Sequence, residues 1–405
     1  MARAESRASA REIPEAKGGA SASIVGHGAE PTICIVQAVA KQYREPFFDA
    51  LYFRLKNQGI RLQVIYSDPN SFEARRKDAV DLPPSYGRKV HALWLFRQRV
   101  LFQRVPVAAL TADLVIVEQA SKYVLNYVFA LLSTLGILRL AYWGHGRNWQ
   151  QPQESGMGRV KRAMLRRADW WFAYTARVAD YVRDNGFSSE RITVVQNSVD
   201  TSGLRQQIND FDEQARAALR EELGIARTDR VGLFCGSMHT DKQLAFLVRA
   251  AVELRNRLPG FHLILVGAGP DETIARTAAA KHAWVHHIGP QFGGARVPYF
   301  AIADVFLCPG LVGLAVLDAF AAGLPLFTTD IPIHSPEIDY LEDGINGGIS
   351  EFDPAIYAEN IGKVLASPGI LAQMKSNAEA SAQRYGLDVM VENFFRGVLA
   401  CLDRS

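Results

Sequence analysis

The stretch from Asp304 to Asp330 constrains the fold of this chain more than any other segment. Its first part, the apolar run Val305 to Cys308, predicts a buried parallel strand. A Pro-Gly pair that includes Gly310 ends this strand, and apolar residues at helical spacing then predict a short helix from about Gly313. The segment 325–329 predicts the next strand. A strand, a glycine loop, a helix and a second strand are the parts of a parallel α/β sheet.

The glycine loop before this helix predicts an anion-binding site. The N-terminus of a helix leaves backbone N–H groups without partners, and a phosphate is their usual ligand. These N–H groups belong to Gly313 and Leu314, and Asp318 lies about one turn inside the helix. Its carboxylate is a candidate acceptor for the hydroxyls of a sugar diol. An ordinary β–α–β connection with a glycine at the helix start explains the same pattern without a ligand.

The length of the chain and its alternating pattern predict two domains. The chain has 405 residues, of which 48% are hydrophobic, and can bury two full cores. Predicted strands and helices alternate from Thr32 to about residue 200 and again from Val231 to Asp330, which is typical of two doubly wound, Rossmann-like parallel sheets. We predict a flexible tail at 1–30, a first domain at 31–205, a second domain at 206–384, and a C-terminal helix at 385–405 that packs back on the first domain.

The predicted strands also indicate where ligands bind. They lie at 33–36, 62–66, 89–95, 114–117, 139–143, 170–174 and 192–196, and in the second domain at 231–235, 262–266, 284–288, 305–308 and 325–329. Ligands of doubly wound sheets bind beyond the carboxyl ends of the strands. This rule places Tyr43, Arg44, Glu118 and His145 at the working edge of the first sheet. Two such domains that face each other create an interdomain cleft, a favoured place for a ligand.

Composition argues against several classes of protein. The 45 Lys and Arg residues nearly balance the 42 Asp and Glu residues, and this net charge of +3 does not point to nucleic acid. The four cysteines show no metal-ligand spacing and predict no disulfide framework, which favours a reducing compartment. Residues 1–30 lack the apolar core of a secretory signal. The uncharged run 123–138 is shorter than the roughly 20 residues of a membrane span, so we expect a buried or interfacial helix there.

Four motifs resemble those of family 4 retaining glycosyltransferases, which have the GT-B fold. The segment Gly313 to Pro325 is similar to the family pattern G-L-x-x-x-E-A-x-A-x-G-x-P, and Gly236 to Lys242 is similar to G-R-x-x-x-E-K. The run Gln196 to Asp200 resembles N-G-V-D, and the segment 144–146, Gly-His-Gly, resembles the histidine loop of the acceptor domain. The motifs occur in the family's order, and the resemblance covers nearly everything from about residue 31 onward.

The resemblance implies an enzyme that moves a sugar from a nucleotide-sugar donor to a glycan or lipid-linked glycan, with retention of configuration, in surface polysaccharide synthesis. Lys242 would place its ammonium near the diphosphate, and His145 would reach the donor sugar or the leaving group. Neither a cofactor nor a metal is expected, since Lys242 and the helix dipole neutralise the phosphates and no D-x-D motif stands where one would be expected. The implied donor-binding residues are Gly236, Ser237, Gly267, Gly269, Gly310, Gly313, Leu314 and Asp318, and the acceptor-side residues are Tyr43, Arg44 and Glu118.

Three positions depart from the family pattern. Gly310 stands where the family has a Glu that touches the donor sugar, Ser237 replaces an Arg, and Asp318 replaces a Glu. These changes leave open a non-catalytic relative that binds nucleotide sugars, whereas an epimerase on the same fold would lack its usual carboxylate cluster here. The structural alternatives are a solvated helix start for Lys242, a capped loop histidine for His145, an ion pair for Asp318, and a surface charge for Glu337, which otherwise resembles a late Glu of the family.

Basic residues interleave with apolar ones at 159–167, as in helices that lie on anionic membranes. The basic residues are Arg159, Lys161, Arg162, Arg166 and Arg167, and a similar pattern elsewhere in the first domain holds Arg97, Arg99 and Arg104. An amphipathic helix docked on its own sheet is the alternative. With the membrane interpretation, we expect a cytoplasmic protein that is peripheral at the inner membrane face, where it meets a lipid-linked acceptor.

Overall fold

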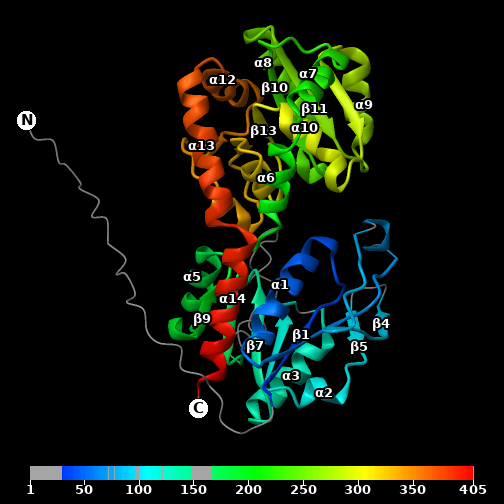
Figure 1. The fold of residues 1–405 in the computed structure, drawn as a ribbon, viewed down its shortest axis with the longest axis vertical. Coiled ribbons are helices and arrows are strands. Elements are labelled where there is room, and N and C mark those ends of the chain that lie inside the picture. The colour runs from blue at the N-terminus through cyan, green and yellow to red at the C-terminus, as the bar shows by residue number, and fades with distance from the viewer. Residues whose placement is uncertain are drawn as a thin grey trace, which may run out of the picture. The chain divides into compact units, whose positions relative to one another are not determined.

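Two parallel β-sheets, which follow each other along the chain, organise the structure (Figure 1). The computed structural model describes residues 30–71, 73–76, 78–96, 100–120, 122–146 and 167–404. The two sheets confirm the predicted fold class of two doubly wound α/β units. The predicted tail lies almost entirely outside the described residues, and the domain boundaries stay predictions.

The first sheet has seven parallel strands in the order β3-β2-β1-β6-β7-β8-β9. In its central strand β1, Ile33, Cys34 and Ile35 are fully buried, as expected for a parallel strand with helices on both faces. One face packs against α1, and the other packs against α3 and α5. The strands are β1 Thr32–Val36, β2 Arg61–Tyr66, β3 Gly87–Lys89, β6 Leu114–Glu118, β7 Arg139–Gly144, β8 Trp170–Ala173 and β9 Ile192–Val194. The helices are α1 Glu45–Lys56, α2 Val107–Leu110, α3 Val124–Thr134 and α5 Ala176–Asp184, with 3-10 turns η1 Gln42–Arg44, η2 Glu73–Arg76 and η3 Ser189–Arg191.

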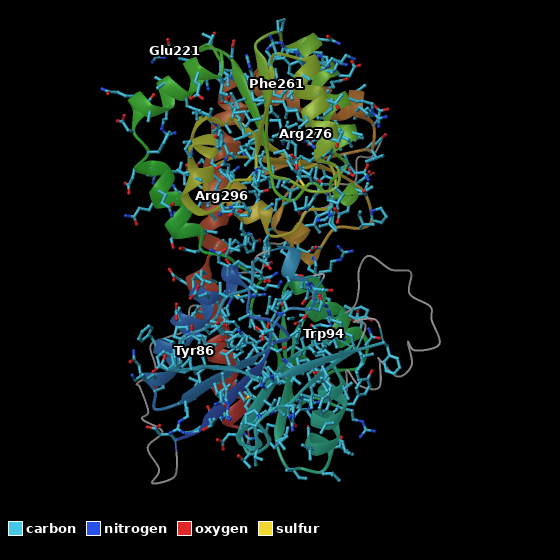
Figure 2. The ribbon with its side chains drawn as sticks, turned by 90° about the vertical axis from the view of Figure 1, so that its right-hand side faces the viewer. Tyr86, Trp94, Glu221, Phe261, Arg276 and Arg296 are labelled. Carbon is cyan, nitrogen blue, oxygen red and sulfur yellow. The ribbon has the colours of Figure 1, made fainter. Side chains whose placement is uncertain are left out.

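The prediction of one strand at 89–95 is wrong, because two different elements share this segment. Strand β3 ends at Lys89, the first residue of the predicted segment. Residues Ala92–Leu95 form a separate strand, β4, which pairs antiparallel with β5, Val100–Gln103. On β4, Trp94 (Figure 2) packs against a small apolar cluster beside the first sheet, while Leu93 is exposed. Pairing two nearby segments costs less loop-closure entropy than bringing a distant strand to the sheet.

The second sheet has six parallel strands in the order β12-β11-β10-β13-β14-β15. Its strands are β10 Arg230–Cys235, β11 Phe261–Val266, β12 Val285–Gly289, β13 Val305–Leu307, β14 Leu326–Thr329 and β15 Gly347–Ser350. Its helices are α6 Thr201–Asn209, α7 Glu213–Glu222, α8 Leu244–Arg257, α9 Glu272–Lys281, α10 Val297–Ile302, α11 Ala315–Ala321, α12 Pro354–Leu365 and α13 Pro368–Arg384, with 3-10 turns η4 Thr240–Lys242, η5 Gly293–Arg296 and η6 Pro336–Tyr340. The organising stretch thus forms β13, α11 and β14.

Strand β15 was not predicted, because a Gly-Gly pair at its start carries no strand propensity. The structure gives a different reason for these residues. A Cβ added to Gly347 would lie 2.0 Å from the carbonyl oxygen of Leu326 on the neighbouring strand. Only glycine allows the two backbones to approach so closely.

The last helix, α14 (Leu387–Leu402), packs on the first sheet although it follows the second in sequence. Phe394 stacks on Phe172 with ring centroids 4.3 Å apart and meets Trp143 edge-on at 5.1 Å. Figure 1 shows this helix beside α1 and β9. The chain therefore returns to its first half and ties the two sheets together.

Helix α3 covers most of the uncharged run from 123 to 138. It has 11 residues, and its inward side chains Leu125 and Phe129 belong to the core of the first sheet. Over the described part of the chain, no helix combines the length and the apolar character that crossing a membrane requires.

Candidate functional site

The predicted donor-binding loops meet at one point of the second sheet. The chain runs from β10 outward to β12 and then crosses back to β13, so β10 and β13 flank the point where the winding reverses. Doubly wound sheets bind ligands at such switch points, beyond the carboxyl ends of the strands. Here those ends carry the loops 236–242 and 308–314, which hold most of the predicted donor-binding residues.

Backbone contact between these two loops explains the glycine at position 310. A Cβ on Gly310 would lie 2.1 Å from the carbonyl oxygen of Asp241 and 2.6 Å from the Cα of Lys242. The adjacent N–H of Leu311 donates a hydrogen bond of 2.8 Å to the same carbonyl of Asp241. The space that a glutamate side chain would need is therefore filled by backbone, so this chain has no carboxylate at that position.

We expect Gly310→Ala to lower the free energy of unfolding by about 1–3 kcal/mol, because the new methyl group must push two backbones apart. Gly313→Ala is the matched control in the same loop, since its Cβ would meet Ser335 Oγ at an ordinary 3.7 Å. Urea unfolding of both variants measures the difference. Equal stabilities for the two variants would contradict the proposed contact.

The other glycines of the predicted site hold two loops against each other. Gly267 has φ +140°, and a Cβ there would lie 1.9 Å from the carbonyl oxygen of Gly236. The equivalent atom on Gly269 would lie 2.4 Å from the carbonyl oxygen of Met238. Ser237 lies on the exposed side of this contact. The backbones of the loops after β10 and β11 are therefore in close contact beside the switch point.

Lys242 places a positive charge at the loop after β13. It ends η4 and does not start a helix, because Gln243 has a left-handed conformation with φ 57° and α8 begins at Leu244. The partly buried ammonium donates a hydrogen bond to the carbonyl oxygen of Leu311. An ammonium held in this way is placed to meet an anionic ligand of the loop.

His334, which the sequence did not single out, fixes the same loop from its other side. Its Nδ1 accepts a hydrogen bond of 3.0 Å from the N–H of Val312, and its Nε2 lies 2.7 Å from the carbonyl oxygen of Thr329. These two contacts require a neutral ring that is protonated on Nε2. Burial, assisted by the charge of Lys242, lowers the pKa of His334 and favours that form.

Asp318 is engaged by an arginine. Both of its carboxylate oxygens accept hydrogen bonds from the guanidinium of Arg296 (Figure 2), at 2.5 and 3.1 Å. Both side chains are partly exposed, so water or a ligand reaches them. The ion-pair alternative for Asp318 is therefore observed, and its contact with a sugar diol stays a prediction.

The helix after the glycine loop starts slightly later than predicted. Leu314 is its N-cap residue and Ala315 its first residue. Within the described residues, the backbone N–H groups of Gly313 and Leu314 donate to no protein acceptor. These groups are available to a ligand at the switch point.

At the edge of the first sheet, the predicted residues have different surroundings. Tyr43 is 39% exposed, whereas Arg44 is buried and donates hydrogen bonds to Tyr174 Oη at 3.1 Å and Asn197 Oδ1 at 2.5 Å. Burial raises the pKa of Glu118, which lies at the end of β6. The acceptor-side roles of these three residues stay predictions.

His145 lies in the loop that follows β7. Its ring meets the ring of Tyr174 edge-on, with centroids 4.5 Å apart and an interplanar angle of 89°. The side chain is exposed at its outer edge, but desolvation by the protein packed around the ring and the charge of Arg44 lower the pKa of His145 to about 4. The imidazole is therefore neutral at neutral pH and can donate or accept a hydrogen bond.

Glu337 is buried, so the surface-charge alternative for this residue is wrong. It is 1% exposed, and its Oε1 accepts a hydrogen bond from Asn197 Nδ2. Burial raises its pKa. Sequence alone gave no indication that Asn197 joins Glu337 to Arg44.

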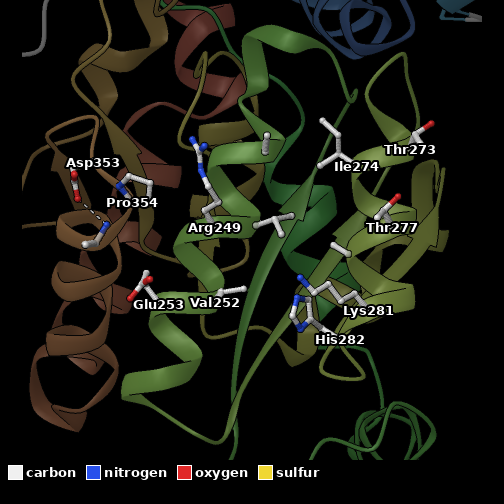
Figure 3. Close-up of a pocket in the computed structure, with 14 residues that line it drawn as sticks. Arg249, Val252, Glu253, Thr273, Ile274, Thr277, Lys281, His282, Asp353 and Pro354 are labelled. Atoms are coloured by element: carbon white, nitrogen blue, oxygen red, sulfur yellow. Dashed lines mark hydrogen bonds between the residues drawn. The ribbon is translucent and has the colours of Figure 1, made fainter.

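A groove of about 750 Å³ lies elsewhere, between α8, α9 and the start of α12 (Figure 3). Val252 of α8 and Ile274 and Thr277 of α9 line it. None of the predicted site residues lines this groove.

Comparison with known proteins agrees with the fold of two doubly wound sheets. A family model described as Glycosyltransferase Family 4 matches residues 47–202, and one described as Glycosyl transferases group 1 matches residues 229–367. D-inositol 3-phosphate glycosyltransferase of Streptomyces scabiei is 27% identical over 245 residues, which is 56% of this chain and 52% of that protein. The chain thus spans about half the length of the curated relatives it matches.

Two solved structures show the same fold over nearly their whole length. HepE of Anabaena, crystallised with UDP, has a TM-score of 0.67 and 16% identity, and the match covers 91% of this chain and 99% of that one. A glycosyltransferase of Rickettsia africae also has a TM-score of 0.67, with 12% identity and coverage of 93% and 100%.

Two doubly wound sheets, with facing glycine loops at the switch point of the second, define a protein of the GT-B glycosyltransferase class. With family models matching both halves, the chain belongs to glycosyltransferase family 4.

Proposed function

We propose that this protein transfers a sugar from a nucleoside-diphosphate donor to a glycan or lipid-linked glycan, with retention of configuration and without a metal. One observation carries the proposal. The ammonium of Lys242, the N–H groups of Gly313 and Leu314, and the carboxylate of Asp318 all belong to loops or helix starts at one switch point. The cation and the two N–H dipoles suit the phosphates of a nucleoside diphosphate, and the carboxylate can accept hydrogen bonds from the hydroxyls of its ribose.

In the proposed reaction, the bond between the anomeric carbon and the oxygen of the β-phosphate breaks, and its electron pair stays on the phosphate. The acceptor hydroxyl forms the new bond on the same face of the sugar, and its proton passes to the departing diphosphate. Lys242 and the loop N–H groups stabilise the charge that develops on the phosphate. The neutral His145 supplies a hydrogen bond to the donor sugar without adding a charge.

Metal independence is part of this proposal. Lys242 supplies at the phosphates the positive charge that a metal ion would otherwise provide. Purified protein should therefore release nucleoside diphosphate from at least one nucleotide sugar, with and without EDTA. If a donor binds but is never cleaved, the non-catalytic alternative holds.

We also propose that the first domain meets an anionic membrane surface. Among the residues predicted for this contact, Arg104 and Arg167 are described and exposed, whereas Arg97, Arg99, Arg159, Lys161, Arg162 and Arg166 lie outside the described residues. Exposed apolar side chains add to the surface: Leu131 and Leu135 are 60% and 63% exposed at helical spacing in and after α3. Four free cysteines support a place on the cytoplasmic side, where a reducing compartment keeps thiols reduced.

We expect the protein to co-sediment with vesicles that contain anionic lipid and to stay in solution with neutral vesicles, because each basic residue near the surface contributes about 1 kcal/mol. Changing Leu131 and Leu135 to Glu should reduce this binding several-fold. The matched control is Ile370→Glu, which alters a residue that is 50% exposed on α13. Binding that ignores lipid charge, or that survives the double change, would favour a soluble acceptor.

A further inference from the structure

Three buried polar residues connect the two sheets in a continuous relay. Arg44 lies before α1 in the first half, Asn197 follows β9, and Glu337 lies in η6 of the second half. Asn197 accepts from Arg44 through Oδ1 at 2.5 Å and donates to Glu337 through Nδ2. All three side chains belong to residues that are at most 4% exposed. The amide therefore joins a buried cation to a buried carboxyl group.

The surroundings of the relay make it rigid. The guanidinium of Arg44 also lies over the ring of Trp143, 4.6 Å from its centroid, and donates to Tyr174 Oη. On the other side, Tyr340 Oη accepts a hydrogen bond of 2.8 Å from the backbone N–H of Asn197. A buried arginine without such partners would be strongly destabilising, so its position is fixed by the groups that satisfy it.

The relay ends beside His145. Tyr174, which accepts the hydrogen bond from Arg44, holds the His145 ring edge-on at 4.5 Å. Arg44 from η1 acts on the charge of His145, and Tyr174, which follows β8, contacts its ring. The groups that act on Tyr174 in turn are Arg44, Tyr43, Glu118 and Glu337. Among them Arg44 is the cation that acts directly on the imidazole, and it lowers the pKa of His145 in addition to burial.

We propose that Arg44 is a positioning residue for sugar transfer: through the Asn197–Glu337 relay, the second sheet fixes Arg44, and Arg44 with Tyr174 fixes the neutral ring of His145. The inference rests on the proposed function, because His145 matters to catalysis only if the protein transfers sugar. It goes beyond that function by making the state of His145 depend on contact between the two sheets.

The test separates this inference from the reaction itself. Histidine labelled with 13C at Cε1 gives a resonance for His145, identified by its loss in His145→Gln, and its titration is followed by NMR without any substrate. In Arg44→Met we expect the pKa of His145 to rise by about one from its value of about 4, the size that a neighbouring charge commonly produces. In Arg44→Lys, which keeps the charge, the pKa should stay low.

Turnover gives the second readout. We expect Arg44→Met and Arg44→Lys to lower kcat about tenfold or more, because small displacements of a reacting group cost up to 10²-fold, while KM for the donor changes less than about threefold. The matched control is Arg54→Met. Arg54 donates a hydrogen bond to Glu392 of α14, and its guanidinium lies over the ring of Phe395, 4.1 Å from the centroid. This variant should leave both kcat and the pKa of His145 unchanged.

Two results would overturn the inference. One is a folded Arg44→Met protein in which the pKa of His145 is unchanged. The other, should Arg44→Met not fold, is an Arg44→Lys protein with the kcat of the wild type. If the pKa of His145 does not rise in Arg44→Met, the inference is refuted even if sugar transfer is real. If the pKa rises but the wild-type protein shows no turnover, only the proposed function is refuted.

Discussion

Replacing Lys242 with alanine is expected to lower turnover by about 10²-fold or more, because removing one preorganised donor to a developing oxyanion costs that much in other enzymes. Lys242 is the only Lys or Arg in the stretch 236–242, and its ammonium lies against the loop after β13. Breaking the bond to the anomeric carbon puts negative charge on the phosphate, so the loss should fall on kcat more than on donor binding. Initial rates of nucleoside-diphosphate release measure it.

Two controls separate charge from folding in this experiment. Lys242→Arg keeps a cation and should retain more activity than the alanine variant. Lys281→Ala removes an exposed lysine of the same domain, at the end of α9, and should have no effect. Turnover that is unchanged in Lys242→Ala would remove Lys242 from the account.

Replacing Asp318 with alanine is expected to weaken nucleoside-diphosphate binding by about 1.5–3 kcal/mol, the loss of charge-assisted hydrogen bonds to two ribose hydroxyls. Arg296 donates a hydrogen bond to each of the two carboxylate oxygens. Each oxygen has a further lone pair, so the carboxylate can accept from the ribose while it stays paired. Calorimetric titration with UDP, GDP and ADP in turn measures the change.

The partner residue provides the control for Asp318. Arg296→Met also breaks the ion pair but keeps the carboxylate, so it should bind the nucleotide within about threefold of the wild type. A 2′,3′-dideoxy nucleotide should bind the wild type and Asp318→Ala equally, since it lacks the diol. Equal affinities of the ordinary nucleotide for wild type and Asp318→Ala would assign Asp318 a structural role only.

The parallel sheets could be predicted because their strands are continuous apolar runs. Ile33 to Val36 and Val231 to Phe234 are buried, and such runs are visible in the sequence without any knowledge of partners. The hairpin formed by β4 and β5 is different, because only the pairing partner of Ala92–Leu95 tells which sheet it joins.

The donor loops could be predicted for a similar reason, since each motif lies within a few residues of one strand end. Their contacts could not. Gly310 is a glycine because the backbone of Asp241 and Lys242 lies against it, and that approach depends on how β10 and β13 are paired. Arg296 gives no local indication that it will hold Asp318, since the pair forms only when η5 and α11 are brought together.

The relay is the extreme case. Arg44 and Asn197 are 153 residues apart, and Asn197 and Glu337 are 140 residues apart. Taken singly, none of the three residues indicates a buried contact: the sequence suggests an arginine in a loop, an asparagine before a helix and a glutamate on the surface. Only the fold shows that together they compensate one buried charge.

Sugar transfer with retention from a donor at the second sheet is tested most directly by proton NMR of the first product formed from an α-linked nucleotide sugar. For the donor that the protein cleaves fastest, we expect the α-anomeric signal of the product to appear first, in the presence of EDTA, and Lys242→Ala to suppress it. A β anomer as the first product would show inversion and rule out the proposed reaction.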